Sequence, residues 1–402
     1  MTYYDDHVSG SVVVVGAGII GAACARALCA RGFAVTIVER GAAVGGTSAA
    51  GEGNLLLSDK APGPELELAQ YSARLWPEVV ADLAVELGDE FPSLEYELKG
   101  GLVVATGEAD ASALSSFARR QRDHRVRAET LNIAEARRLE PEVTEQLTSA
   151  VYYPDDAQVQ PVIAAEALLA SARARGATVL LGAKVIGPLI DADGALYGVV
   201  TTKGDVRSDH VVVAAGPWSG EVAHSLGALL PVAPRRGFVL VTSPMTQRIF
   251  HKVYDADYVG AVGSNERALQ TSTVVESTAS GTVLIGSSRE RVGFDSGLDV
   301  DVVAELATKA VRLFPFLADV SLMRVYCGFR PFIPDHLPVI GEDLNYRGLW
   351  YATGHEGAGI GLAPATGEML ATLLSGDAPE LSAEPFSPSR PSLALAIAET
   401  SP

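Results

Sequence analysis

A glycine-rich segment near the N-terminus, Ser11 to Arg40, constrains the fold more than any other part of the chain. The apolar run Val12 to Val15 leads directly into Gly16, Gly18 and Gly21, which have the spacing G-x-G-x-x-G. This order predicts a buried parallel strand that turns sharply into a helix. The free N–H groups at the start of such a helix can face the pyrophosphate of a dinucleotide.

Each glycine of this fingerprint has its own expected role. Gly16 permits the turn, Gly18 lets the backbone approach the pyrophosphate, and Gly21 lets the helix pack closely against the strands. The second strand ends at Glu39, which follows Gly16 by 23 residues, close to the roughly 20 expected for a carboxylate that binds ribose hydroxyls. The alternative is a glycine-rich turn in an unrelated α/β protein, but strand, helix and acid in register favour the dinucleotide site.

Length, charge and cysteine usage exclude several classes of protein. The chain has 402 residues and 48% hydrophobic residues, so two globular domains are expected. Its formal net charge of −18 disfavours nucleic acid or an anionic membrane surface as partner. No apolar run approaches the roughly 20 residues of a membrane span, and residues 1–10 lack the features of a secretory signal, which favours a cytoplasmic protein. The three cysteines, Cys24, Cys29 and Cys327, indicate neither a disulfide framework nor a metal site.

Hydrophobic periodicity predicts the remaining elements. Helices are expected at residues 64–87, with Pro77 as a kink or junction, and at 111–122, 162–175, 302–314 and 360–374. Asn132 and Glu135 form a capping box that should open a further short helix. Strands are expected at residues 98–106, 178–181, 185–190, 196–202, 210–215, 237–242, 269–275, 282–286 and 349–352. We expect the strands 178–181, 185–190 and 196–202 to form one meander, and residues 324–341 to form a loop rich in proline and aromatic residues.

This order of elements predicts two discontinuous domains. The dinucleotide-binding domain should comprise residues 8–90, 151–225 and 325–375, and the substrate domain residues 91–150 and 226–324. Residues 376–402, rich in proline, serine and glutamate, should form a loose C-terminal tail.

Several dispersed motifs resemble those of the D-amino-acid oxidase family of FAD-dependent oxidoreductases, over about residues 11 to 374. Besides the opening fingerprint with Glu39, they are Gly46-Thr47-Ser48, Ala215-Gly216-Pro217-Trp218, Gly328-Phe329-Arg330-Pro331 with Pro334-Asp335 and Pro338, and Gly354-His355 with Gly357 and Gly359. The ending GHEGAGIGLAPATG, and Gly286 to Glu290 with Gly293-Phe294-Asp295, look most like the branch that contains glycine oxidase, D-amino-acid dehydrogenase, and the flavin subunits of proline dehydrogenase and cyanide synthase. The resemblance implies an α/β fold, with a Rossmann-like FAD-binding domain and a discontinuous α+β substrate domain built on an antiparallel sheet.

The resemblance also implies which residues bind FAD. Thr47 and Ser48 can donate hydrogen bonds to phosphate or ribityl oxygens, and Gly51, Gly53 and Asn54 leave room for the isoalloxazine ring, although a flexible loop is the alternative. Val185 would pack on adenine or only form core. The full implied set is Gly16, Gly18, Ile19, Ile20, Gly21, Glu39, Arg40, Gly46, Thr47, Ser48, Gly51, Gly53, Asn54, Leu55, Val185, Ala215, Gly216, Trp218, Arg330, Gly354, His355, Glu356, Gly357, Ala358, Gly359 and Ile360.

Two further details concern the bound flavin. The glycine-rich residues 354–359 precede a helix, whose N-terminal dipole would stabilise negative charge on the pyrimidine end of the reduced ring. His355 would add to this effect or cap the helix, and the sequence favours neither. Cys327 stands about one residue out of register with the cysteine that carries the flavin covalently in sarcosine-oxidase relatives, which favours non-covalent FAD.

Arg330 is the predicted catalytic-site residue, because the family places an arginine at this position to bind the substrate carboxylate. A solvated surface arginine is the alternative, disfavoured because Arg330 stands between Phe329 and Pro331 in the expected loop without charged neighbours. His251, Tyr254 and Tyr258 are candidates for the pocket wall only.

The resemblance implies oxidation of an amino or imino acid, bound with a neutral amine, by hydride transfer from Cα to flavin N5. Such chemistry depends mainly on positioning, so the lack of an evident general base is no objection. Oxygen, a quinone or a partner protein would accept the electrons, and a homo- or hetero-oligomer is possible. Three alternatives are a flavin subunit of a larger dehydrogenase, an NAD-dependent reductase and a non-enzymatic binding module.

Overall fold

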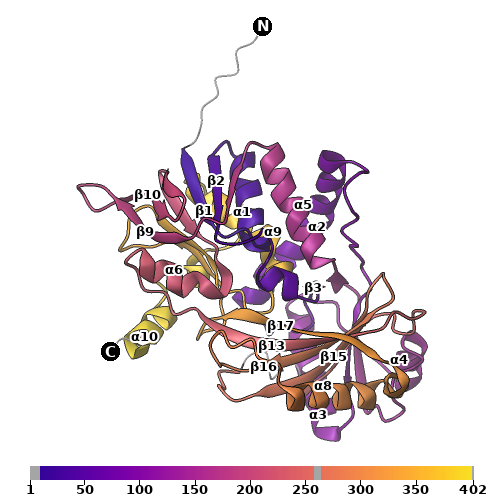
Figure 1. Cartoon of the computed structure of the whole chain (residues 1–402). Coiled ribbons are helices and arrows are strands. Elements are labelled where there is room, and N and C mark those ends of the chain that lie inside the picture. The colour runs from indigo at the N-terminus through magenta and orange to yellow at the C-terminus, as the bar shows by residue number, and fades with distance from the viewer. Residues whose placement is uncertain (1–9, 258–263, 401–402) are drawn as a thin grey trace.

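The computed structural model describes residues 10–257 and 264–400. Figure 1 shows a part built around the N-terminal strands and a part built on a broad sheet beneath it. The first part contains a six-stranded sheet in which all neighbours are parallel except β18 and β19. Its strands, in spatial order, are β18 (Val339–Glu342), β19 (Leu349–Thr353), β12 (His210–Val213), β1 (Ser11–Val15), β2 (Ala34–Glu39) and β8 (Thr178–Leu181).

Both faces of this sheet are covered. Val12 and Val14 of β1 share a core with the helices α1 (Ile19–Ala30), α2 (Pro64–Leu87), α5 (Pro161–Ala174) and α9 (Gly359–Leu374), which Figure 1 shows together beside β1 and β2. Val13 and Val15 face the opposite way, toward a three-stranded sheet and α6 (Ser219–Ser225). The small sheet consists of β9 (Val185–Ile190), β10 (Leu196–Thr201) and β11 (Gly204–Arg207). The predicted Rossmann-like arrangement is confirmed.

The expected meander is wrong in its membership. Strand β8 does not join β9 and β10 but pairs in parallel with β2, and β11 supplies the third strand of the small sheet. The reason is topological: β8 directly follows α5, and a helical crossover is what a parallel strand needs.

The second part is an eight-stranded sheet covered by helices. In spatial order its strands are β17 (Leu322–Phe332), β13 (Ala233–Thr242), β16 (Val283–Arg289), β15 (Gln270–Ser277), β14 (Lys252–Asp255), β4 (Gly101–Ala105), β6 (Ser149–Tyr153) and β5 (Glu129–Leu131). The sheet is mixed rather than purely antiparallel, because β14 and β4 are parallel. Helix α8 (Val300–Leu313) buries its apolar stripe against one face, and α3 (Glu108–Asp123) packs near β4 and β6. Asn132 and Glu135 form the expected capping box at the start of α4 (Ile133–Leu139).

The expected loop at residues 324–341 is also wrong, because β17 occupies its first half. This strand pairs with β13 along almost its whole length and forms the edge of the sheet. An edge strand tolerates Pro331, since one side of the strand needs no N–H donors. Arg330 therefore lies on a strand directly opposite Arg235, and the expectation that it has no charged neighbours fails.

Two further expectations need adjustment. Helix α2 runs through Pro77 without a break into two helices. The C-terminal segment, expected to be a loose tail, packs on the rest of the protein. Phe386 in η4 (Glu384–Phe386) and Leu393 in α10 (Pro391–Thr400) are buried, and Arg390 pairs with Asp335. The domain boundaries remain a prediction. Within residues 10–257 and 264–400, none of the helices has the length and apolar character that crossing a membrane requires.

Candidate active site

A cavity of about 590 Å³ lies between the N-terminal glycine turn, the start of α9 and the face of β13 and β17. Five residues of the predicted cofactor set do not border it: Gly21, Gly53, Leu55, Gly354 and Ala358. The others all do, namely Gly16, Gly18, Ile19, Ile20, Glu39, Arg40, Gly46, Thr47, Ser48, Gly51, Asn54, Val185, Ala215, Gly216, Trp218, Arg330, His355, Glu356, Gly357, Gly359 and Ile360. The structure thus brings together residues from across the chain at one site.

The glycine turn is shaped so that only glycine fits at two positions. Gly16 has a φ of +118°, and a Cβ there would lie 2.5 Å from the carbonyl oxygen of Ala214. A Cβ on Gly21 would lie 2.0 Å from the carbonyl oxygen of Gly16. Gly21 therefore acts by packing helix against turn rather than by bordering the cavity.

The residues beside this turn fit a dinucleotide such as FAD. Helix α1 begins after Gly18, which has no capping side chain, and Gly18 and Ile19 border the cavity. The N-terminus of this helix is therefore suited to bind an anion. One of its N–H groups, that of Ile19, already donates to Ser48 Oγ at 3.0 Å. Glu39 ends β2 at the cavity edge, where Oε2 accepts from Ala17 N at 3.0 Å and Oε1 from Gly41 N at 2.8 Å. These bonds hold the carboxylate in place at the edge where ribose hydroxyls would bind.

The loop around η1 (Thr47–Ala50) forms a second wall. Thr47 Oγ1 donates to the carbonyl oxygen of Phe329 at 2.5 Å, which ties the loop to β17. A Cβ on Gly51 would lie 2.7 Å from Cδ1 of Ile360, and a Cβ on Gly328 would lie 2.6 Å from Cβ of Ala50. The loop is thus packed between α9 and β17 and is not an open flexible turn. Which cofactor atoms each residue binds remains a prediction.

His355 borders the cavity but does not cap α9, and whether it stabilises the reduced flavin stays a prediction. Its side chain is buried, and Nε2 lies 2.9 Å from Oγ1 of Thr366. Burial lowers the pKa of His355 to about 3, so the ring is neutral at physiological pH. The residue before α9 is Ala358, and no side chain caps that helix. His355 therefore neither caps the helix nor carries positive charge.

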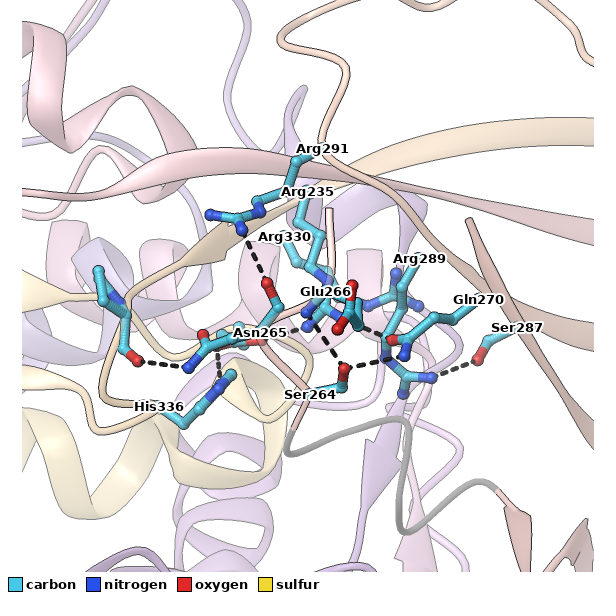
Figure 2. Close-up of polar contacts among 12 residues, drawn as sticks. Arg235, Ser264, Asn265, Glu266, Gln270, Ser287, Arg289, Arg291, Arg330 and His336 are labelled. Atoms are coloured by element: carbon cyan, nitrogen blue, oxygen red, sulfur yellow. Dashed lines mark hydrogen bonds and ion pairs between the residues drawn. The ribbon is translucent and has the colours of Figure 1, made fainter. Parts of the chain in front are cut away.

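Four arginines, which we call the arginine cluster, lie near one another: Arg235 on β13, Arg289 on β16, Arg291 just after it and Arg330 on β17 (Figure 2). Of these, Arg330 borders the cavity. Arg330 Nη1 donates to the carbonyl oxygen of Ser288 at 2.9 Å. The guanidinium lies over Gly237, where a Cβ would be 2.2 Å from Nη1. Glycine at this position leaves room for the arginine at the cavity wall.

Arg235, which lies opposite Arg330 on the neighbouring strand, is fully buried. Its guanidinium donates to Glu356 Oε2 at 3.4 Å and to Gln270 Oε1 at 3.0 Å. His336 Nδ1 lies 2.6 Å from the other oxygen of Glu356. Burial lowers the pKa of Arg235, Glu356 opposes this, and the nearby Arg289 lowers the pKa further. The region around Arg330 is therefore electropositive, and an anionic group is the ligand that suits it.

Two of the three candidates for the pocket wall, His251 and Tyr254, lie away from the cavity. Nδ1 of His251 lies 2.8 Å from Oε1 of Glu140, and the hydroxyl of Tyr254 donates to Ser58 inside the core. Neither residue borders the cavity, and Tyr258 lies outside the described residues.

Sequence reasoning missed Glu52, which borders the cavity between Gly51 and Gly53. An acid enclosed by glycines in a loop assigned to the flavin was a usable signal. Its neighbours Lys252 on β14 and Glu276 on β15 belong to no sequence motif, so the sequence could not have indicated them.

Comparison with known proteins decides the family. Residues 11–373 match the family model described as DAO, FAD dependent oxidoreductase. The chain belongs to this family. A glycine oxidase of Pseudomonas aeruginosa is 33% identical over 385 residues, which cover 94% of this chain and 99% of that protein.

Solved structures agree with this family. The glycine oxidase of Geobacillus kaustophilus superposes with a TM-score of 0.85 at 28% identity, covering 95% of this chain and 98% of that one. An iminodiacetate oxidase of Chelativorans sp. BNC1 gives a TM-score of 0.80 at 25% identity, covering 94% and 98%. This protein is therefore an FAD-dependent oxidoreductase that acts on carbon–nitrogen bonds, and the glycine turn with Glu39 is suited to hold its FAD.

Proposed function

We propose that this protein oxidises an amino or imino acid, removing a hydride from the α carbon and leaving an imine that hydrolyses to a keto acid and an amine or ammonia. The observation that carries the proposal is the placement of the Arg330 guanidinium over Gly237, in the wall of the cavity that the FAD-binding glycines also border. The similarity to glycine and iminodiacetate oxidases supports the same substrate class.

Arg330 would bind the substrate carboxylate through its planar fork of N–H donors. The Ser288 carbonyl that accepts from Nη1 fixes the orientation of this fork. When bound, FAD supplies the hydride acceptor at N5. The protein contributes by holding the α carbon in one orientation and by excluding water, and orientation of this kind accounts for a large part of such catalysis.

The electron acceptor belongs to the same proposal. Oxygen would make the protein an oxidase, whereas a quinone or a partner protein would make it a dehydrogenase. The substrate oxidation is the same in each case, so the acceptor is tested separately.

An anaerobic screen of amino and imino acids against the FAD-loaded protein tests this function. We expect one subset of these acids to bleach the flavin absorbance, and the matching amines without a carboxylate to fail. Admission of air then shows whether oxygen restores the colour at a catalytic rate. If no amino or imino acid bleaches the flavin of the folded protein, the proposed function is wrong.

A further inference from the structure

Glu52 occupies the same cavity as Arg330 but carries the opposite charge. It lies in the loop between η1 and β3 (Asn54–Leu55), and only 9% of its surface is exposed. Oε2 accepts from Asn54 Nδ2 at 3.0 Å and lies 3.9 Å from Lys252 Nζ. Among the described residues, Oε1 has no hydrogen-bond partner and is buried against Gly286, where a Cβ would lie 2.4 Å away. A buried carboxylate oxygen without a donor is unfavourable unless a ligand supplies one.

The surroundings of Glu52 favour a cationic ligand. Lys252 is shared between Glu52 and Glu276, whose carboxylate lies 3.2 Å from Nζ and is fully buried. Oε1 of Glu276 also has no hydrogen-bond partner within the described part of the chain. Tyr326 on β17 also lies within the electrostatic reach of Glu52, and the charge of Lys99 acts on Glu276. Burial raises the pKa of Glu276, Lys252 opposes this, and the charge of Glu52 raises it further, as expected for a buried carboxylate beside a second negative charge.

The separation of the two charges fits one α-amino acid. The pairing of Leu240 with Ile285 puts Gly286 beside Val239, two residues along β13 from Gly237. Two residues along one strand, combined with one step to the neighbouring strand, put Gly237 and Gly286 about 8 Å apart. Arg330 lies over Gly237 and Glu52 over Gly286, so this is also the approximate distance between guanidinium and carboxylate. An ammonium and a carboxylate group joined through one carbon, with a hydrogen bond of about 2.8 Å at either end, span about 8 Å as well.

We propose that Glu52 binds the amino group of the substrate, opposite the carboxylate held by Arg330, and accepts a proton from that group before oxidation. This inference rests on the proposed function and names the residue that recognises the amine. The terminal torsion of a glutamate is broad, so the carboxylate of Glu52 can turn until one oxygen meets a ligand in the cavity that Glu52 borders.

The proton transfer is balanced as written. One N–H bond of the substrate ammonium breaks, an O–H bond forms on Glu52, and the nitrogen keeps the electron pair. That lone pair then forms the C=N bond as the hydride leaves the α carbon. The substrate would thus enter as a cation and react with a neutral amine.

Among the carboxylates that border the cavity, Glu356 is the competitor that lies beside the arginine cluster. Both of its oxygens already have cationic or polar partners, Arg235 at 3.4 Å and His336 at 2.6 Å. Its ion pair belongs to the arginine cluster, where an anion is favoured. Glu52, with a partnerless oxygen, is therefore the better acceptor for an ammonium group.

The test compares amine recognition with carboxylate recognition in Glu52→Gln. The probes are the amino acid selected by the screen and propionate, an amine-free carboxylate whose binding is read from the shift in flavin absorbance. We expect kcat/KM at neutral pH to fall at least about tenfold, whereas the Kd of propionate changes by less than about twofold. The ratio of kcat/KM between the original protein and Glu52→Gln should shrink by about tenfold for each unit that the pH rises toward the pKa of the substrate amine. The reason is that the variant can then take up substrate whose amine is already neutral in solution.

Three variants make the result specific. Glu52→Asp keeps the charge at shorter reach and should give an intermediate kcat/KM with the pH dependence of the original protein, and it serves as the test if Glu52→Gln does not retain FAD. Glu356→Gln should keep the original preference for the amino acid over propionate. Glu145→Gln, at an exposed surface position, controls for handling. Equal loss of propionate and amino-acid binding in Glu52→Gln, or a deficit that does not change with pH, would overturn the inference even though the original protein bleaches with amino acids.

Discussion

At the scale of single residues, glycines differ sharply in how much room their surroundings leave for a side chain. Gly21 is pressed against the Gly16 carbonyl, whereas a Cβ on Gly187 of β9 would have no atom within 4 Å, and the φ of Gly187 is ordinary. Gly21 is therefore required by contact, whereas Gly187 is not.

Gly21→Ala tests this difference. We expect it to displace the start of α1 from the turn and to reduce FAD content severely, because its Cβ would lie 2.0 Å from a backbone oxygen. Gly187→Ala is the matched control and should keep normal FAD content. The measurement is the ratio of flavin to protein absorbance after purification, and full flavin content in Gly21→Ala would contradict the assignment of the turn.

Arg330 should separate substrate binding from cofactor binding. Arg330→Lys keeps the charge but loses the planar fork, and Arg330→Ala loses both, so KM should rise through this series. Truncating one partner of a buried charged pair costs roughly 2 to 5 kcal/mol, so kcat/KM of the alanine variant should fall at least about thirty-fold. Steady-state kinetics with the substrate found in the screen check this. Normal turnover by Arg330→Ala would show that the substrate carboxylate binds elsewhere.

At the scale of elements, the C-terminal segment is fastened to the loop after β17. Arg390 donates to both oxygens of Asp335, at 2.6 and 2.9 Å, and also to the carbonyl oxygens of Leu337 and Pro338. Burial alone would raise the pKa of Asp335, but the hydrogen bonds from Arg390 and Ser392 outweigh it and lower the pKa. This loop leads into β18, so the tail supports an edge of the FAD-binding sheet.

Removing the guanidinium should therefore destabilise the protein in a pH-dependent way. Arg390→Ala leaves a buried carboxylate uncompensated, which typically costs about 3 to 5 kcal/mol. Because the folded-state pKa of Asp335 is lowered, the stabilisation is present above the unfolded value of about 4 and is lost as the pH falls further. The difference in Tm between original and variant should be largest near pH 7 and shrink below about pH 4. Adding Asp335→Asn to Arg390→Ala should recover part of the loss, and a Tm difference independent of pH would argue against the ion pair.

At the scale of the whole molecule, the cavity is bordered by both parts of the chain. Val15 and Glu39 come from the six-stranded sheet, whereas Val239 and Arg330 come from the eight-stranded sheet. A molecule of FAD bound there would contact both, so its removal should affect the stability of the whole protein and not only of one domain.

We expect FAD to leave without breaking a covalent bond. Cys327 pairs with Phe238 and packs against the core under α8, on the face of β17 turned away from the cavity that Gly328 borders. Acid precipitation should release the flavin into the supernatant, and Cys327→Ala should retain the original flavin content. Colour that stays in the precipitate would mean a covalent link.

The apoprotein prepared in this way should melt at a lower temperature. Ligand at one hundred times its Kd stabilises the folded state by about 2.7 kcal/mol, so Tm should rise when FAD is added back. ADP, which contains only the half that meets the glycine turn, should restore part of the difference. An unchanged Tm on adding FAD would contradict a cavity shared by both parts.

The sequence by itself determined the glycine turn and the family, and it pointed to Arg330, whose role in substrate binding stays a prediction. These depend on local rules: a strand, three glycines, a helix and an acid in fixed spacing leave few other folds, and the remaining motifs kept the family's order. It also determined the capping box at α4, which involves residues three positions apart.

Only the tertiary structure decided what Arg330 and Glu52 face. Whether residues 322–332 form a loop or an edge strand depends on β13, a partner nearly ninety positions earlier, because hydrogen bonds between strands do not appear in local periodicity. The same holds for Lys252 and Glu276, which reach Glu52 only because β14 and β15 lie beneath the loop after η1. Long-range strand pairing set the charges around the cavity, and no short motif could have revealed them.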